Sequence, residues 1–211
     1  MENNVNSSKV YTLYYAFFLI PLIITIFGVM FFFMFKVLTY ETSAPEDYLT
    51  DIQIGSATKR WQAAFELSKL LSNPEMVPTD EGFKNKMISI YEHSIHDNPM
   101  VRTYMALAMG RTGQQEYGPT LMNGMNDKDK GSRLAAIKAL GLLAYAPAVN
   151  GIQEFADEKY SNAERLAATI ALGNMGDKSL IPILQKLLDD EEPNIRWDAA
   201  IALAKLEDSS G

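Results

Sequence analysis

"RLAAIKALG" at residues 133–141 returns as "RLAATIALG" at residues 165–173, and the two stretches differ at only two positions. Each stretch has few side chains that can donate or accept a proton or act as a nucleophile, so a duplicated active site does not explain the repeat. Alanine and leucine instead suit a short helix that packs against other helices. The recurrence after 32 residues therefore predicts a protein built from repeated helical segments.

Five arginines extend this register along the chain. Seven positions after each arginine stands Leu or Met, and eight positions after it stands Ser, Gly or Ala. The arginines are Arg60, Arg102, Arg133, Arg165 and Arg196. We predict a structural role for them in every repeat, because a guanidinium near a helix start can bond carbonyl or carboxylate groups of the adjoining turn. A basic ladder that binds a ligand is the alternative.

Each repeat is predicted to contain two helices. Four positions before the arginines stand Ser56, Asn98, Asp129, Ser161 and Glu192, and the first four have the short side chains of amino-terminal caps. We expect the first helix to run for about three turns and to end at its small residue, followed in two repeats by Gly113 or Gly176. Second helices are expected from Thr79, Glu116, Pro147 and Ser179. The first helices are apolar almost all round, so each must be covered by neighbours, and the second helices are expected to form any binding groove.

Two helices in about 31 residues and an R-x-x-A-x-x-A-L-G core resemble the short HEAT-like repeats, a type also found in phycobilin lyases. The segments "NIRWDAAIALAKL" and "AERLAATIALGNMGDKSLIPILQKLL" carry the resemblance best, and it covers residues 56–206. It implies an all-α fold in which about five HEAT-like helix pairs form a right-handed α-solenoid. The first repeat is longer by about eleven residues, and the third has "GLLAYAP" where a Gly-x-x-Gly turn is expected.

The amino-terminal part has a different composition. No charge interrupts the 26 residues between Lys9 and Lys36, and such a helix is long enough to cross a hydrocarbon core of about 30 Å. We predict a tail at 1–9 and a transmembrane helix at 10–38 that contacts lipid. A cleaved signal peptide is the alternative, but its apolar stretch is usually 7 to 15 residues. The flanking charges nearly balance, so a cytoplasmic repeat domain is favoured mainly because a short tail crosses a membrane easily.

Residues 39–55 are predicted to form a linker and a short helix, capped by Ser43 and stopped by Gly55, that covers the first repeat. Residues 207–211 are predicted to be a carboxyl-terminal tail. The net charge of −7 and the lack of a basic cluster argue against nucleic acid as a partner. The chain has no cysteine, which excludes disulfides and thiolate sites.

Signals of catalysis are weak. His93 and His96 could hold a metal with a carboxylate, but no third ligand is evident, and a solvent-facing position explains them better. The acidic run 189–192 lacks the alternating ligands of a calcium loop and is read as a solvated turn. No nucleophile or phosphate-loop motif occurs. We therefore expect no catalytic, metal or cofactor site.

Trp61 and Trp197 directly follow an aligned arginine in the first and last repeats. They are the candidate partner-binding residues, with filling of gaps at the solenoid ends as the alternative. The sequence predicts a membrane-anchored HEAT-repeat scaffold that docks other proteins, as a subunit or assembly factor of a membrane complex such as a transporter. Two alternatives stay open. One is a bilin-lyase-like enzyme. The other is a protein whose membrane span is the functional part and packs into a transporter or channel, with the solenoid stabilising its cytoplasmic portion.

Overall fold

The computed structural model describes residues 12–38 and 44–206. The chain divides into two compact parts, Met1–Ser43 and Ala44–Gly211, and we call the second part the repeat domain. The tails expected at 1–9 and 207–211, most of the linker and the expected cap Ser43 lie outside the described residues.

The amino-terminal part is one apolar helix. A π-helical turn, Tyr15–Leu19, leads into α2, Ile20–Leu38. The turn precedes Pro21, which has no N–H to donate to the preceding turn, and the Ile20 amide donates to the Tyr15 carbonyl instead. The segment Thr12–Lys36 has a mean hydropathy of 2.6 and is the one described helix long and apolar enough to cross a membrane. Length and composition alone carry this finding, and a signal sequence meets the same criteria.

The repeat domain opens with α3, Pro45–Ile54, which packs on α4 and α5 as the expected cover of the first repeat. Its amino-terminal cap is Ala44, whose amide donates to the Asp47 carboxylate, and Gly55 ends it. The first helices of the repeats are α4 (Ala57–Leu70), α6 (Pro99–Arg111), α8 (Lys130–Leu142), α10 (Asn162–Asn174) and α12 (Pro193–Lys205). The second helices are α5 (Glu81–His93), α7 (Gly118–Gly124), α9 (Val149–Glu154) and α11 (Ile181–Lys186). Within the described residues the fifth repeat is α12 alone.

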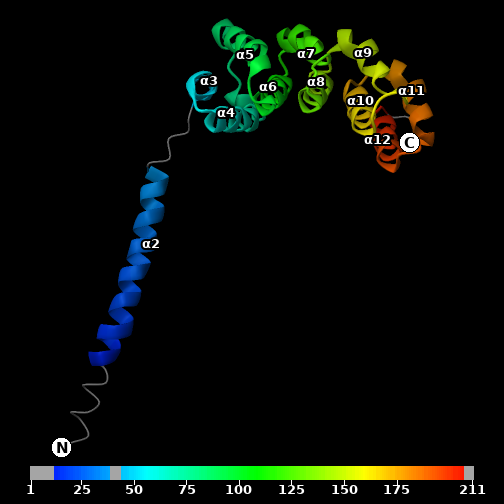
Figure 1. Cartoon of the computed structure of the whole chain (residues 1–211). Helices are drawn as coiled ribbons and strands as arrows, with labels where there is room; N and C mark the ends of the chain where they lie inside the picture. The colour runs from blue at the N-terminus through cyan, green and yellow to red at the C-terminus, as the bar shows by residue number, and fades with distance from the viewer. Residues whose placement is uncertain (1–11, 39–43, 207–211) are drawn as a thin grey trace, which may run out of the picture. The chain divides into compact units, whose positions relative to one another are not determined.

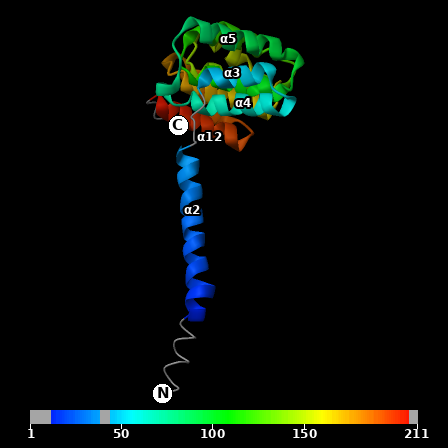
Figure 2. The same cartoon turned by 90° about the vertical axis from the view of Figure 1, so that its left-hand side faces the viewer.

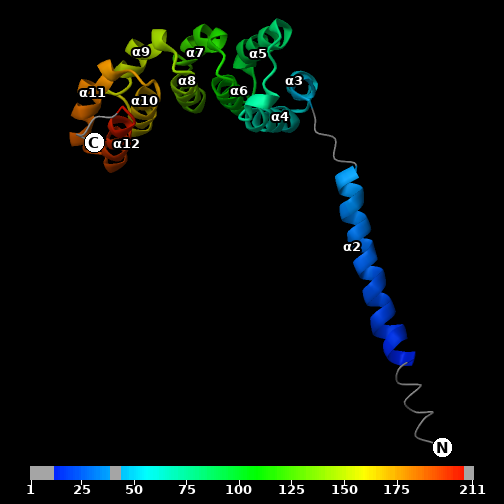
Figure 3. The ribbon, with the colours of Figure 1, turned by 180° about the vertical axis from the view of Figure 1, so that it is seen from behind.

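The helices form two layers. Each first helix packs against the first helix of the next repeat, so that α4, α6, α8, α10 and α12 lie side by side. Figures 1 and 3 show the row bent into an arc, with the first helices on the inner side and α5, α7, α9 and α11 on the outer side. Figure 2 looks along the row, with α3, α4 and α5 in front of the later repeats. The expectation that the second helices would line the concave side is therefore wrong, because the alanine-rich first helices lie on the inner side of the arc.

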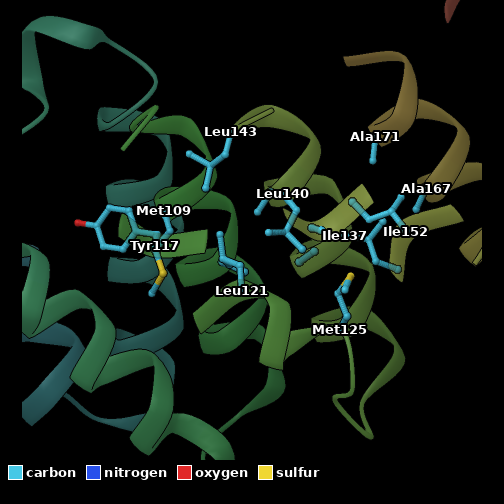
Figure 4. Packing of buried hydrophobic residues seen from close by; sticks show 14 of the residues in the cluster. Met109, Tyr117, Leu121, Met125, Ile137, Leu140, Leu143, Ile152, Ala167 and Ala171 are labelled. Atoms are coloured by element: carbon cyan, nitrogen blue, oxygen red, sulfur yellow. The ribbon is translucent and has the colours of Figure 1, made fainter. Parts of the chain in front are cut away.

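Short 3-10 turns shape the outer layer. Gln115–Tyr117, Ala146–Ala148 and Lys178–Leu180 lead into α7, α9 and α11. Further 3-10 turns are Pro74–Met76, Ser94–His96 and Leu187–Asp189. Between the two layers lies one cluster of buried apolar side chains that runs through every repeat, and Figure 4 shows part of it, from Tyr117 to Ala171.

The four predicted caps stand immediately before the first turn of α4, α6, α8 and α10, and Glu192 caps α12 in the same way. Ser161 and Glu164 form a capping box. Gly113 and Gly176 adopt φ of +72° and +69° just beyond α6 and α10, the left-handed position that ends a helix. In the third repeat Ala144 takes the same place, with φ of +48°.

The small residues eight positions after the arginines were expected to end the first helices. They do not end them. Each helix continues past them, and the glycines instead allow close contact between repeats. A Cβ atom added at Gly110 would lie 2.6 Å from the Cα of Ala139, and one at Gly141 would lie 2.5 Å from the Cα of Ala171. Gly173 stands in the same relation to Ala202. The recurring glycine and alanine thus set the separation between neighbouring first helices.

Candidate functional site

The five arginines lie at one register position, four residues after the cap of each first helix. Four of them reach a carboxylate at the start of the next repeat. The pairs are Arg60 with Asp97, Arg102 with Asp127, Arg133 with Glu164, and Arg165 with Asp190. A row of ion pairs therefore links consecutive repeats along one edge of the domain.

Backbone carbonyls complete the coordination of these guanidinium groups. Arg60 donates to the Ile52 carbonyl at 2.7 Å, and Arg133 donates to the Asp127 carbonyl at 2.6 Å. Arg196 bonds only carbonyls, those of Asp190 and Glu191, at 2.7 and 3.0 Å. The guanidinium groups thus hold the turns between repeats, which is the chemistry that the sequence indicated for them.

The acidic run 189–192 was expected to be a solvated turn, but part of it is buried and bonded. The Asp190 side chain is only 4% exposed, faces Arg165 and accepts from the Glu192 amide at 2.9 Å. Glu192 caps α12. Two of the four acidic residues therefore join the last two repeats.

Open grooves lie along the same edge. One of about 560 Å³ separates the ends of α5 and α7 and is lined by Tyr91, His96, Arg102 and Asp127 among others. A second of about 530 Å³ lies between α9 and α11, beside Arg165 and Asp190. Burial among these groups raises the pKa of Tyr91 to about 12, so its phenol stays protonated.

The histidines do not converge on a third ligand. His93 Nδ1 lies 2.7 Å from the Ser89 carbonyl oxygen, while His96 lies in the groove beside α7. Across residues 12–38 and 44–206 no three His, Asp or Glu side chains are grouped as metal ligands would be.

A different surface gathers apolar side chains. Positions one, five and nine after each arginine are all at least partly exposed, whereas positions three and seven are buried in every repeat. Residues two positions apart lie about 200° apart around a helix, so the exposed rows face away from the second helices. They therefore cover the inner side of the arc in Figure 1.

We call this surface the inner face. Its first row is Trp61, Thr103, Leu134, Leu166 and Trp197; its middle row is Phe65, Leu107, Lys138, Ile170 and Ile201; its third row is Lys69, Arg111, Leu142, Asn174 and Lys205. Nine of these fifteen residues are apolar, and among them Trp197 is 71% exposed, Leu142 48% and Ile201 40%.

Both tryptophans belong to the first row of the inner face. Trp61 is half-buried and packs against the core, whereas Trp197 stands open to solvent at the last repeat. Beside them, the Phe65 and Tyr104 rings meet edge to face with centroids 5.1 Å apart, which joins the first two repeats. Sequence reasoning named the tryptophans and missed the apolar middle row, although its four-residue spacing from the first row was available.

A continuous arc of paired helices with one core defines the class of α-solenoid proteins. The protein-family model for HEAT repeats matches residues 86–163 and 149–210, which together make up more than half of the chain. The chain belongs to the HEAT-repeat family.

Solved structures share the fold at low identity. The complex of CpcE and CpcF of phycocyanin lyase from Nostoc sp. PCC7120 matches at a TM-score of 0.63 and 21% identity, over 80% of this chain and 66% of that chain. An engineered protein matches at a TM-score of 0.57 and 16% identity, over 77% of this chain and 78% of that chain. This chain thus spans less than two thirds of the lyase chain that it matches. None of the curated protein sequences compared with the chain matches it.

Proposed function

We propose that this protein is a membrane-anchored docking protein that binds another protein, a subunit of a membrane complex, through the inner face. The apolar inner face is the observation that carries the proposal. Proteins bury contiguous apolar surface unless it serves an interaction, and aromatic side chains such as Trp197 dominate interface energetics.

We propose no catalytic activity for this protein. The buried polar groups of the repeat domain are largely engaged in structural bonds, as in the arginine and carboxylate pairs of the inter-repeat turns. Fold alone does not carry an activity from one α-solenoid to another.

Co-purification tests the docking function. The full chain, extracted in mild detergent from its own cells, should return a second protein in constant ratio, and the double variant Trp197→Ala, Leu142→Ser should lose it. Ile95→Ser is the matched control, because Ile95 is 62% exposed and lies off the inner face. Recovery of the chain alone, or loss of the second protein only with Ile95→Ser, would remove support for the inner face as the docking surface.

The membrane anchor needs its own test. We propose that Thr12–Lys36 is retained and spans the bilayer, with the repeat domain in the cytoplasm. Mass spectrometry of the mature chain should detect these residues, and alkaline extraction should leave the chain in the membrane. Added protease should cleave the repeat domain only after the membrane has been opened to give access to the cytoplasmic side. A mature chain that begins after Lys36 would show that the segment is a signal peptide.

Two alternatives predict different outcomes. A lyase-like activity, suggested only by the fold shared with the phycocyanin lyase complex, predicts an absorbance change when a bilin is mixed with the full chain. A working membrane span predicts that replacing residues 10–38 with an unrelated apolar helix abolishes partner recovery. The docking proposal expects no absorbance change and unchanged recovery.

A further inference from the structure

The charges of the inner face have one sign. Its three rows contain Lys69, Arg111, Lys138 and Lys205 and no Asp or Glu, although the whole chain has 26 acidic and 19 basic residues. Three of the four cations stand in the third row, beside the apolar first and middle rows. The inner face therefore combines an apolar strip with a positive margin on an otherwise acidic protein.

These cations are only partly satisfied within the protein. Lys138 is exposed and has no ion pair or hydrogen bond among the described residues. Lys205 donates to the Asn174 side chain at 2.9 Å, and one nitrogen of Arg111 donates to the Ser68 carbonyl at 2.6 Å. Neither of these partners carries a charge. Lys69 alone has a carboxylate, that of Glu66 at 3.0 Å, and that pair is exposed.

The dimensions suit a single polypeptide segment. From the first row to the third is eight residues of helix, about 12 Å at 1.5 Å per residue. Five parallel helices at about 8–10 Å spacing extend over roughly 32–40 Å, the length of about nine to twelve extended residues. A partner segment of that length can lie across all five first helices.

We propose that the partner segment is acidic and apolar: its apolar side chains lie on the first and middle rows, and Asp or Glu residues along one side face the cations of the third row and Lys138. This inference rests on the proposed docking function. Charge complementarity supports it, because a basic segment would meet four like charges, whereas an acidic one would neutralise them. The rest of the chain has a net negative charge, which would weaken binding of such a segment elsewhere.

Selection from a random dodecapeptide library displayed on phage tests the inference, with the full chain in detergent as bait. Recovered peptides should be enriched in Asp, Glu and large apolar residues relative to the library. A fluorescent copy of a recovered peptide should bind Lys138→Glu about fivefold to twentyfold more weakly than the unchanged chain. Lys138→Ala should give a smaller loss, and both variants should keep the circular dichroism melting profile.

Lys128→Glu is the matched control, because it makes the same charge change at an exposed lysine between α7 and α8, off the inner face. It should change affinity less than twofold. Equal losses with Lys128→Glu and Lys138→Glu would reject the inference, because they would reflect net charge alone.

Other outcomes separate the inference from the function on which it rests. Peptides that need Trp197 but show no acidic enrichment would overturn the inference and leave the docking function standing. Failure to select any peptide, together with co-purification that Trp197→Ala leaves unchanged, would overturn both. Displacement of a recovered peptide by phosphatidylglycerol micelles, and not by neutral micelles, would assign the inner face to anionic lipid and reject the inference.

Discussion

Ala144 is the one described residue other than glycine with a positive φ. It ends α8 with φ of +48°, where the other turns of this type use glycine. The surrounding bonds complete a Schellman motif, since the Ala144 amide donates to the Gly141 carbonyl and the Tyr145 amide to the Leu140 carbonyl, both at 3.1 Å.

We predict that Ala144→Gly raises the free energy of unfolding by about 0.5–1 kcal/mol, because glycine adopts positive φ without a Cβ clash. Urea unfolding of the full chain in detergent, followed by far-ultraviolet circular dichroism, measures the change. Gly113→Ala, at the corresponding position of α6, should change stability in the opposite direction. A destabilised Ala144→Gly would contradict this explanation.

Gly141 occupies the contact between α8 and α10. A methyl group there would lie 2.5 Å from the Cα of Ala171, so the two helices would have to separate. We predict that Gly141→Ala lowers the free energy of unfolding by about 1–3 kcal/mol, despite the better helix propensity of alanine.

The control for this prediction is Gly131→Ala in the first turn of the same helix. A methyl group at Gly131 would come no closer than 3.3 Å to another side chain, so the change should stay below about 1 kcal/mol. Equal effects at the two glycines would mean that close helix packing is not what Gly141 provides.

Between elements, the arginine and carboxylate pairs differ in burial. The side chains of Arg102 and Asp127 are 8% and 10% exposed, whereas Arg196 is exposed and bonds carbonyls only. We predict that Arg102→Met lowers the free energy of unfolding by about 3 kcal/mol, because it leaves the Asp127 carboxylate buried without its partner.

Arg196→Met should cost about 1 kcal/mol or less, since its hydrogen bonds are exchanged for water. The same urea titration compares the two variants. Similar costs would show that burial of the ion pair does not determine the contribution of each arginine.

Glu164 links α8 to α10 and makes stability depend on pH. The Ser161 hydroxyl donates to it at 2.6 Å and Arg133 Nε at 2.9 Å, and these bonds lower its pKa from 4.5 to about 2. Because the folded pKa is below the unfolded one, the contribution is fully present above about pH 5 and is lost as the pH falls toward 2.

We predict that Glu164→Gln lowers the free energy of unfolding by about 2–3 kcal/mol at pH 7, and that the difference from the unchanged chain shrinks at pH 3. Urea midpoints at the two pH values give the measurement. Glu158→Gln, at an exposed residue in the turn that precedes α10, should have little effect at either pH. A constant difference for Glu164→Gln would contradict the pKa assignment.

At the scale of the whole molecule, local signals were readable from the sequence. The caps, the positive φ of Gly113 and Gly176 and the arginine register depend on residues a few positions apart, and the structure has them where predicted. The contact of Gly141 with Ala171, the pairing of Arg102 with Asp127 and the inner position of the first helices depend on how separate repeats stack. Spacing within one repeat does not determine those contacts.

The inner face was only half predicted for the same reason. Trp61 and Trp197 were conspicuous because each directly follows an aligned arginine, in the first and last repeats. Leu107, Ile170 and Ile201 look like core residues until the buried side of each first helix is known. Identifying the candidate site therefore required the stacking of the repeats in space as well as the spacing of residues in the sequence.

Site-specific photo-crosslinking in the source cells tests the central claim, that the inner face docks another protein. A benzoylphenylalanine at Leu142, on the inner face, should form a crosslink to one other protein, within a peptide that contains apolar and acidic residues. The same probe at Glu158, exposed off the inner face, should not. Crosslinks from position 158 and none from position 142 would contradict the account.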